Sequence, residues 1–152
     1  MSEIADVKIG ELFPVQADSP NCFACGQENP HGIKLRFKKE SDTSISTTFT
    51  PPKEWTGWGD IMHGGFQALL LDETMSWAVG GIALVKAFVT SNLDIKYLKP
   101  VKVQQELKVF AHVEEDSDKI VKVSGQIKSD NDSVLASAKA VFVKVNPAML
   151  VS

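Results

Sequence analysis

Apolar residues dominate one stretch of the chain, from Phe66 to Val79. The stretch has the length of a helix, contains no proline or glycine before Gly80 and Gly81, and is apolar on nearly every side. A helix with this pattern is wrapped by other structure and does not lie on a surface. Two carboxylates, Asp72 and Glu73, interrupt it. Because an unpartnered buried carboxylate is very unfavourable, we expect at least one of the two to have a function.

Alternation of apolar and polar residues predicts strands on both sides of this helix. Two strands precede it, at residues 33–37 and 44–49, and four follow it, at 88–98, 103–113, 120–128 and 134–145. Turns at 114–118 and 129–133 join the last three strands in an antiparallel meander. A sheet of about six strands with one helix against its face is an α+β arrangement, and such a sheet must curl around the helix.

Residues 1–20 carry a weak helical pattern that Pro14 and Pro20 close. We interpret this segment as an N-terminal arm packed on a single domain that spans residues 21–152. The length of 152 residues and the 43% content of hydrophobic residues are sufficient for one such domain with a sizeable core.

The two cysteines, Cys22 and Cys25, begin a turn rich in glycine and proline. They are too few and too close for a secreted disulfide framework. They could form half of a zinc site with His31 as third ligand, a redox pair, or a tight turn with two small thiols. A structural zinc needs four ligands, and neither a second Cys-x-x-Cys nor a thioredoxin-like strand-to-helix context is present. The sequence therefore favours the turn, and we expect no metal and no cofactor.

The charge pattern excludes several classes of partner. The formal net charge is -3, and no block of lysine or arginine is present to bind nucleic acid or an anionic membrane. The first residues lack a basic segment followed by an apolar run, and no apolar stretch is long enough to cross a bilayer. We therefore expect a cytoplasmic protein that binds neither nucleic acid nor membrane.

Three motifs resemble one known family. His63-Gly64-Gly65 stands nine residues before Asp72, the segment 90–100 follows the helix, and the Cys22 to Leu35 segment is similar to one found in many bacterial members. Together with the order of elements, these motifs resemble the hotdog-fold acyl-CoA thioesterases of the phenylacetate-pathway and thioesterase-superfamily type, over about residues 21–145. The resemblance implies a curved sheet around one long helix and hydrolysis of an acyl-CoA thioester to free acid and coenzyme A.

Thioester hydrolysis passes through an oxyanion, so a site needs N–H groups aimed at that oxygen and a group that activates water or attacks directly. A helix N-terminus offers unpaired N–H groups, and Gly64 and Gly65 would let a substrate carbonyl approach. Asp72 is the candidate base or nucleophile, with Glu73 as its competitor. Asp72 lies roughly 12 Å along the axis from Gly64, at about 1.5 Å per residue, so one helix cannot bring both groups to one carbonyl.

A second, antiparallel copy of the helix would place Gly64 of one subunit opposite Asp72 of the other, with two equivalent sites on a two-fold interface. The resemblance implies the same arrangement, a homodimer that often pairs again into a tetramer. It also matches Thr90 to a position where relatives carry a hydroxyl near the catalytic carboxylate, which we interpret as positioning water. By the same resemblance, His63 would orient the turn or hydrogen-bond the thioester.

Four further residues are candidate substrate contacts: Gly65, Asn92, Trp58 and Lys99. Trp58 belongs to a loop that could line the mouth of a pocket, and Lys99, with Lys96 and Lys102, could meet the phosphates of coenzyme A. A solvated basic edge is the alternative for these lysines. Gly57 stands six residues before His63, where some relatives carry a polar side chain, commonly Asn, so His63 or the Gly64 N–H would have to replace that group.

Each assignment has a purely structural alternative. His63 could only terminate the helix, Gly64 and Gly65 could form only a tight turn, Asp72 could be solvated, and Thr90 could be an ordinary strand residue. Two rival functions also remain, a non-catalytic acyl-CoA-binding domain and a hotdog enoyl-CoA hydratase or dehydratase. The usual His and acid pairing of the latter is missing. The acyl chain would depend on how the tryptophans and Phe66 pack.

Overall fold

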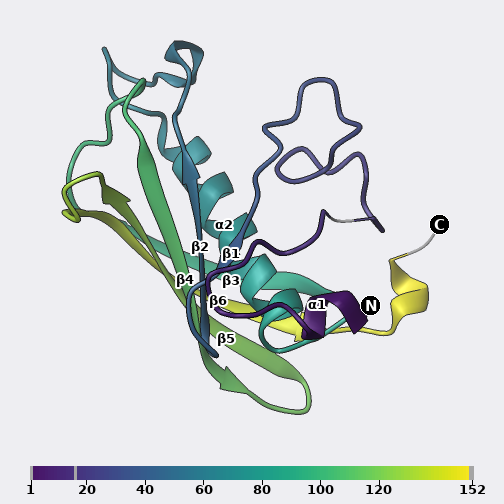
Figure 1. Cartoon of the computed structure of the whole chain (residues 1–152). Helices are drawn as coiled ribbons and strands as arrows, with labels where there is room; N and C mark the ends of the chain where they lie inside the picture. The colour runs from purple at the N-terminus through teal and green to yellow at the C-terminus, as the bar shows by residue number, and fades with distance from the viewer. Residues whose placement is uncertain (1, 16, 151–152) are drawn as a thin grey trace.

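A six-stranded antiparallel sheet curves around one long helix in the computed structural model, which describes residues 2–15 and 17–150 (Figure 1). The strands are β1 (Lys38–Lys39), β2 (Ser44–Phe49), β3 (Phe88–Tyr97), β4 (Leu107–Asp116), β5 (Ile120–Ser129) and β6 (Val134–Lys144). They lie in the order β1-β2-β4-β5-β6-β3. The long helix is α2 (Gly64–Gly81), and the shorter helical segments are α1 (Ser2–Ala5), η1 (Lys53–Trp55) and η2 (Pro147–Met149). The predicted α+β hotdog architecture is confirmed.

Helix α2 supplies the centre of the core, as its apolar pattern predicts. Its residues Leu70, Leu71, Met75, Ala78 and Val79 are fully buried. The helix packs most extensively on β4 and β5. No helix among residues 2–15 and 17–150 is both long enough and apolar enough to span a membrane.

The predicted strand at 33–37 is wrong in its position. Regular pairing is confined to Lys38–Lys39, although Leu35 and Phe37 are buried as the alternation requires. Lys34 has a φ of 52°, which interrupts extended geometry. The Leu35 N–H then donates to the Ala24 carbonyl of the preceding loop, 2.8 Å away. The alternating burial of this segment is therefore as predicted, but its backbone hydrogen bonds go to a loop and not to a strand.

The N-terminal segment protects one edge of the sheet. Instead of the helical pattern expected up to Pro14, the helix ends at Ala5, and the Phe13 N–H donates to the Phe37 carbonyl at 2.8 Å. The Gly10 N–H likewise donates to the Lys39 carbonyl at 2.7 Å. The short strand β1 is therefore covered by this segment, whereas β3, ten residues long, lies at the other end of the sheet with no strand or loop of residues 2–15 and 17–150 hydrogen-bonded to its outer edge.

Candidate active site

The N-terminus of α2 is held by His63 and by two backbone contacts. The His63 Nδ1 accepts a hydrogen bond from the Gly65 N–H at 2.9 Å, which makes the imidazole an N-cap. The His63 N–H donates to the Trp55 carbonyl at 2.8 Å, and the Met62 N–H donates to the Val101 carbonyl at 2.7 Å. The helix therefore begins at a defined position between two loops.

The Gly64 N–H is left without a partner in the part of the chain that the structure describes. Gly65 donates to His63, so Gly64 carries the free donor at the positive end of the helix dipole. The Tyr97 hydroxyl of β3 donates to the Gly64 carbonyl at 2.9 Å, and a Cβ at position 64 would lie 3.3 Å from the Tyr97 ring. A glycine here therefore keeps the approach to this N–H open.

A groove of about 540 Å³ lies at this helix end, between α2 and the segment after β3. Its lining includes Gly64, Gly65, Gln67, Tyr97 and Lys99. Gln67 is buried, and its Nε2 donates to the Met62 carbonyl at 3.3 Å. Its Oε1 is buried without a hydrogen-bond partner among the described residues. Among the described residues that line the groove, the Gly64 N–H is thus a backbone donor without a partner, and Gln67 Oε1 is a buried acceptor without a partner.

Asp72 lies two turns farther along α2 and faces β3. Its Oδ1 accepts a hydrogen bond from the Thr90 hydroxyl at 2.8 Å. Asp72 is half-buried, whereas Thr90 is exposed on the uncovered edge strand. A β-bulge between Thr90 and Asn92 interrupts the regular pairing of β3 with β6 next to this contact. The carboxylate is thus oriented by a hydroxyl, and its other oxygen has no hydrogen-bond partner among the described residues.

Residues 59–136, just over half of the chain and including α2 and β3, match the family described as the Thioesterase superfamily. The chain belongs to this superfamily. It is 29% identical over 112 residues to the acyl-coenzyme A thioesterase THEM4 of Xenopus laevis, covering 73% of this chain and 50% of the frog protein. It is 28% identical to a putative esterase of Saccharolobus solfataricus, covering 90% of this chain and 91% of that protein.

Solved structures show the same fold. A thioesterase superfamily protein has 26% sequence identity and a TM-score of 0.72, covering 79% of this chain and 61% of that chain. The Escherichia coli PaaI protein of the phenylacetic acid degradation operon has 17% identity and a TM-score of 0.68, over 75% of this chain and 81% of its own. A Streptococcus pneumoniae thioesterase protein solved with coenzyme A has 20% identity and a TM-score of 0.66, over 74% and 86%.

Several residues that the sequence predicted as substrate contacts lie away from the groove at the start of α2. Trp58 is 85% exposed and does not line the groove, and Asn92 is exposed on β3. Lys102 pairs with Asp60 at 3.7 Å, while Lys96 lines a different groove on the sheet. Of the three lysines, only Lys99 lies at the groove, where its Nζ donates to the Ser133 hydroxyl at 3.0 Å.

The aromatic residues expected to shape the acyl pocket mostly fill the core. Trp55 is buried and stacks on Phe66 with ring centroids 4.2 Å apart. Trp77 stacks on Phe37 at 5.0 Å. Gln67 was not among the predicted site residues, although a glutamine in an apolar helix is the same kind of signal as the two carboxylates. Gly57 faces His63, since a Cβ there would lie 3.3 Å from the His63 Cα.

Asp72 and Glu73 turn to different parts of the structure. Asp72 faces Thr90, whereas the Glu73 carboxylate contacts the thiol of Cys22 in the loop before the sheet. Burial raises the pKa of the Glu73 carboxyl, the nearby Asp72 charge raises it further, and a hydrogen bond from Cys25 opposes both effects. The two neighbouring acids therefore belong to separate sites.

Proposed function

We propose that this protein hydrolyses acyl-CoA thioesters at sites shared by two copies of the chain. The observation that carries the proposal is the separation of two incomplete half-sites on one helix. The free Gly64 N–H stands at the start of α2, and the Asp72 carboxylate held by Thr90 stands roughly 12 Å farther along. A second copy, antiparallel to the first, would bring one half-site of each chain together.

The uncovered edge of the sheet supports this pairing. Strand β3 carries Thr90, and its exposed apolar side chains include Val89 and Tyr97, which are 43% and 54% exposed. A long edge strand with free backbone groups readily pairs with another chain. Pairing along β3 would bring the Asp72 of one chain toward the helix start of its partner. A dimer is therefore part of the proposed mechanism, and two dimers could pair again into a tetramer.

In the proposed reaction, Asp72 acts as the general base. Water held between the Asp72 carboxylate and the Thr90 hydroxyl attacks the thioester carbonyl carbon, and Asp72 takes its proton. The oxyanion forms against the Gly64 N–H at the positive end of α2. When the carbonyl re-forms and the C–S bond breaks, the leaving thiolate takes the proton that Asp72 had accepted from water, so the products are the free acid and coenzyme A and the carboxylate is restored. His63 keeps Gly65 in the helix turn and so positions Gly64.

The groove at the helix start is the proposed binding site for the substrate's amide-bearing arm. Lys99 meets a phosphate near the groove's rim, and a rotation of the Gln67 side chain would let its unpaired Oε1 accept an N–H from that arm. Two solved relatives contain such a ligand, a Streptococcus pneumoniae protein with coenzyme A and a Streptococcus mutans protein bound to acetyl-CoA. The curated frog relative is an acyl-coenzyme A thioesterase, although this chain spans half of its length.

Thiol release from a panel of short, long and aromatic acyl-CoAs tests the proposal. We expect the Asp72→Asn variant to lose about 100-fold or more in kcat, because positioned general bases contribute 10²- to 10⁴-fold. Asp118→Asn, an exposed acid in a turn, is the matched control and should keep wild-type rates. A folded Asp72→Asn variant with wild-type rates would contradict the mechanism. Saturable binding of acyl-CoA without thiol release by the wild type would make the protein a binding domain.

A further inference from the structure

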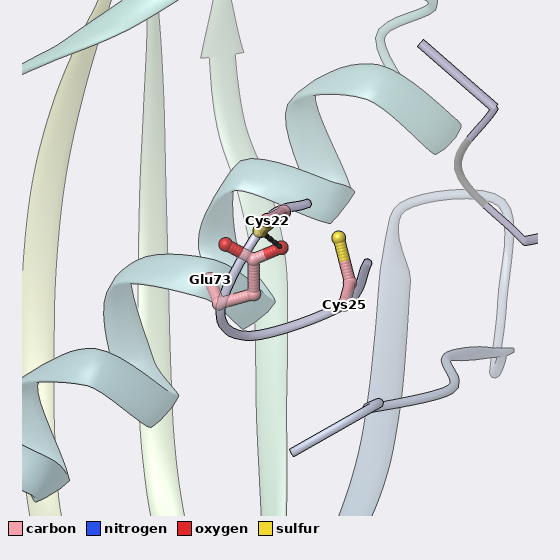
Figure 2. Close-up of side chains that lie close together, drawn as sticks. All are labelled: Cys22, Cys25 and Glu73. Carbon is pink, nitrogen blue, oxygen red and sulfur yellow. Dashed lines mark hydrogen bonds between the residues drawn. The ribbon is translucent and has the colours of Figure 1, made fainter. Parts of the chain in front are cut away.

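Cys22, Cys25 and Glu73 form a cluster away from the proposed active site (Figure 2). Two thiol sulfurs and one carboxylate oxygen all lie within 4.8 Å of one another. The Cys22 Sγ lies 3.8 Å from the Glu73 Oε1, although these residues are 51 positions apart in the sequence. Figure 2 shows the loop of the two cysteines crossing α2 where the Glu73 side chain points toward both sulfurs. The loop and the helix thus present three potential ligands to one point.

The loop geometry holds the two sulfurs on the same side. The Gly26 N–H donates to the Cys22 carbonyl at 2.9 Å and closes a tight turn around both cysteines. A Cβ at position 26 would lie 2.3 Å from the Pro20 carbonyl oxygen, so only glycine fits this turn. Asn29 fastens the same loop through an Nδ2 bond to the Asn21 carbonyl at 3.1 Å. A hydrogen-bonded turn therefore fixes the positions of the two cysteines.

The charges of the cluster favour a cation over a redox pair. Among the described residues, no lysine, arginine or histidine forms an ion pair with Glu73. A reactive dithiol needs a nearby positive charge, and the ion pairs of the described residues bring none to this cluster. Three acidic groups that face one another without a positive partner are the donor set of a soft divalent cation.

We propose that Cys22, Cys25 and Glu73 bind one zinc ion, which fastens the loop of residues 20–35 to helix α2. Zinc takes thiolate and carboxylate ligands at about 2.3 Å and about 2.0 Å. In a tetrahedral site these lengths place sulfur and oxygen roughly 3.5 Å apart and the two sulfurs roughly 3.8 Å apart. The 3.8 Å between Cys22 Sγ and Glu73 Oε1 is about 0.3 Å longer than the tetrahedral sulfur–oxygen distance. The 4.8 Å limit leaves at most about 1.3 Å of contraction for the other sulfur–oxygen pair and about 1 Å for the two sulfurs. Water fills the fourth position.

The position of the cluster means that a bound zinc would link the loop to the helix through three side chains, with water in place of a fourth protein ligand. Glu73 directly follows Asp72, and the loop that it would fasten holds Ala24 and Cys25 in the core. Zinc would tie this loop to the helix turn that carries the proposed base. His31, the third ligand that the sequence spacing suggested, is exposed and lies outside the cluster.

Metal content and affinity of the full chain test the proposal independently of activity. The protein is purified with a phosphine reductant, loaded with zinc chloride, dialysed and analysed for metal, and the zinc dissociation constant is measured against a chromophoric chelator. We expect one zinc per chain. Cys22→Ser, Cys25→Ser and Glu73→Gln should each weaken zinc binding by more than about 100-fold, since even partners outside the ligand set contribute 10- to 100-fold.

Glu28→Gln is the matched control, because Glu28 is an exposed acid on the same loop and should leave zinc binding unchanged. Thermal unfolding with and without zinc shows whether each variant is folded; zinc should raise the Tm of the wild type and the control but not of the ligand variants. If Cys25→Ser does not fold, Cys22→Ser and Glu73→Gln decide. Cobalt(II) should give a thiolate charge-transfer band that each cysteine variant reduces.

Three results would overturn the zinc proposal. The first is less than one zinc per chain in the loaded wild type. The second is a zinc dissociation constant equal to that of the wild type in folded Glu73→Gln, which would show that α2 supplies no ligand. The third is a Cys22–Cys25 disulfide, found by mass spectrometry after purification without reductant, in a protein that stays metal-free after reduction and zinc loading.

Discussion

At the scale of single residues, the donors around each carboxylate decide what that acid can do. Asp72 accepts from one hydroxyl and has a second oxygen that no described residue contacts by a hydrogen bond, which suits a base. Glu73 faces two thiols, which suits metal binding. Glu40 accepts from the Ser46 hydroxyl at 2.5 Å and pairs with Lys38 at 3.1 Å, which suits a structural anion. Three acids in one domain thus have three different environments.

The Glu40 contact predicts a pH-dependent stability difference. The Ser46 hydroxyl is the main cause that lowers the pKa of Glu40, with Lys38 adding to it and burial opposing it. A lowered folded-state pKa stabilises the fold above the unfolded pKa, and this stability is lost as the pH falls through the folded pKa. Urea unfolding should show Ser46→Ala less stable than wild type by about 1 kcal/mol at pH 7. The difference should shrink toward pH 3. An equal difference at both pH values would contradict this account.

Gln67 predicts a change in substrate binding without a loss of fold. Its Oε1 is a buried acceptor without a partner, so Gln67→Leu removes an unsatisfied atom together with the bond to Met62. If the acceptor serves the substrate, the variant should raise KM for the best acyl-CoA by about 2- to 10-fold with little change in kcat, as expected for one lost neutral hydrogen bond. Steady-state thiol release measures both constants. An unchanged KM in the Gln67→Leu variant would show that Gln67 does not contact the substrate.

At the scale of elements, the spacing between α2 and the sheet depends on small residues. A Cβ at Gly125 of β5 would lie 3.2 Å from the Met75 side chain and 3.3 Å from that of Leu71, both fully buried. The facing residue of β6 is Ala138, which is buried as well. The helix therefore touches the sheet where large side chains are absent, because close-packed layers tolerate little added volume.

This contact predicts that Gly125→Val destabilises the fold. The added methyl groups must displace Met75 or Leu71, and overpacking of a core costs about 1–3 kcal/mol. The free energy of unfolding in urea measures the loss. Gln126→Val is the matched control, since Gln126 is the next residue of β5, on the opposite face and half-buried, and valine suits a strand. Equal stability of Gly125→Val and wild type would contradict the close approach.

At the scale of the whole molecule, the two edges of the sheet differ in length and in whether another segment covers them. The β1 edge is two residues long and is covered by residues 10–13, whereas the β3 edge is ten residues long and uncovered. An uncovered edge of this length invites pairing with another chain. The proposed base lies against this edge, so assembly and chemistry are linked in the proposed dimer.

The shared site predicts complementation between two inactive variants. Asp72→Asn removes the base, and Gly64→Val blocks the helix N–H, so each protein alone should retain less than about 1% of wild-type activity. When the two are unfolded, mixed in equal amounts and refolded, half of the dimers should be mixed, and each mixed dimer should have one intact site. About one quarter of wild-type thiol release should therefore return. Mixed activity no higher than the sum of the parents, or a monomer by light scattering, would contradict the shared site.

Local pattern was sufficient to predict several elements. The apolar run predicted α2, and alternation predicted β2 at residues 44–49 with the observed bounds. Residues 33–37 show where this fails: the alternation reports burial of Leu35 and Phe37, but not whether a strand or a loop supplies the hydrogen bonds. Trp58 and Trp55 show the same limit, because sequence alone does not distinguish the exposed indole from the buried one.

The sequence by itself determined the buried helix, the helical spacing of Gly64 and Asp72, and the strand-rich remainder, because these depend on the order and period of residues along the chain. Only the tertiary structure decided that Thr90 meets Asp72, that Glu73 faces two cysteines 48 and 51 positions earlier, and that β3 is the uncovered edge among the described residues. Such contacts depend on how the sheet curves around the helix, which brings distant segments together by packing and not by sequence spacing.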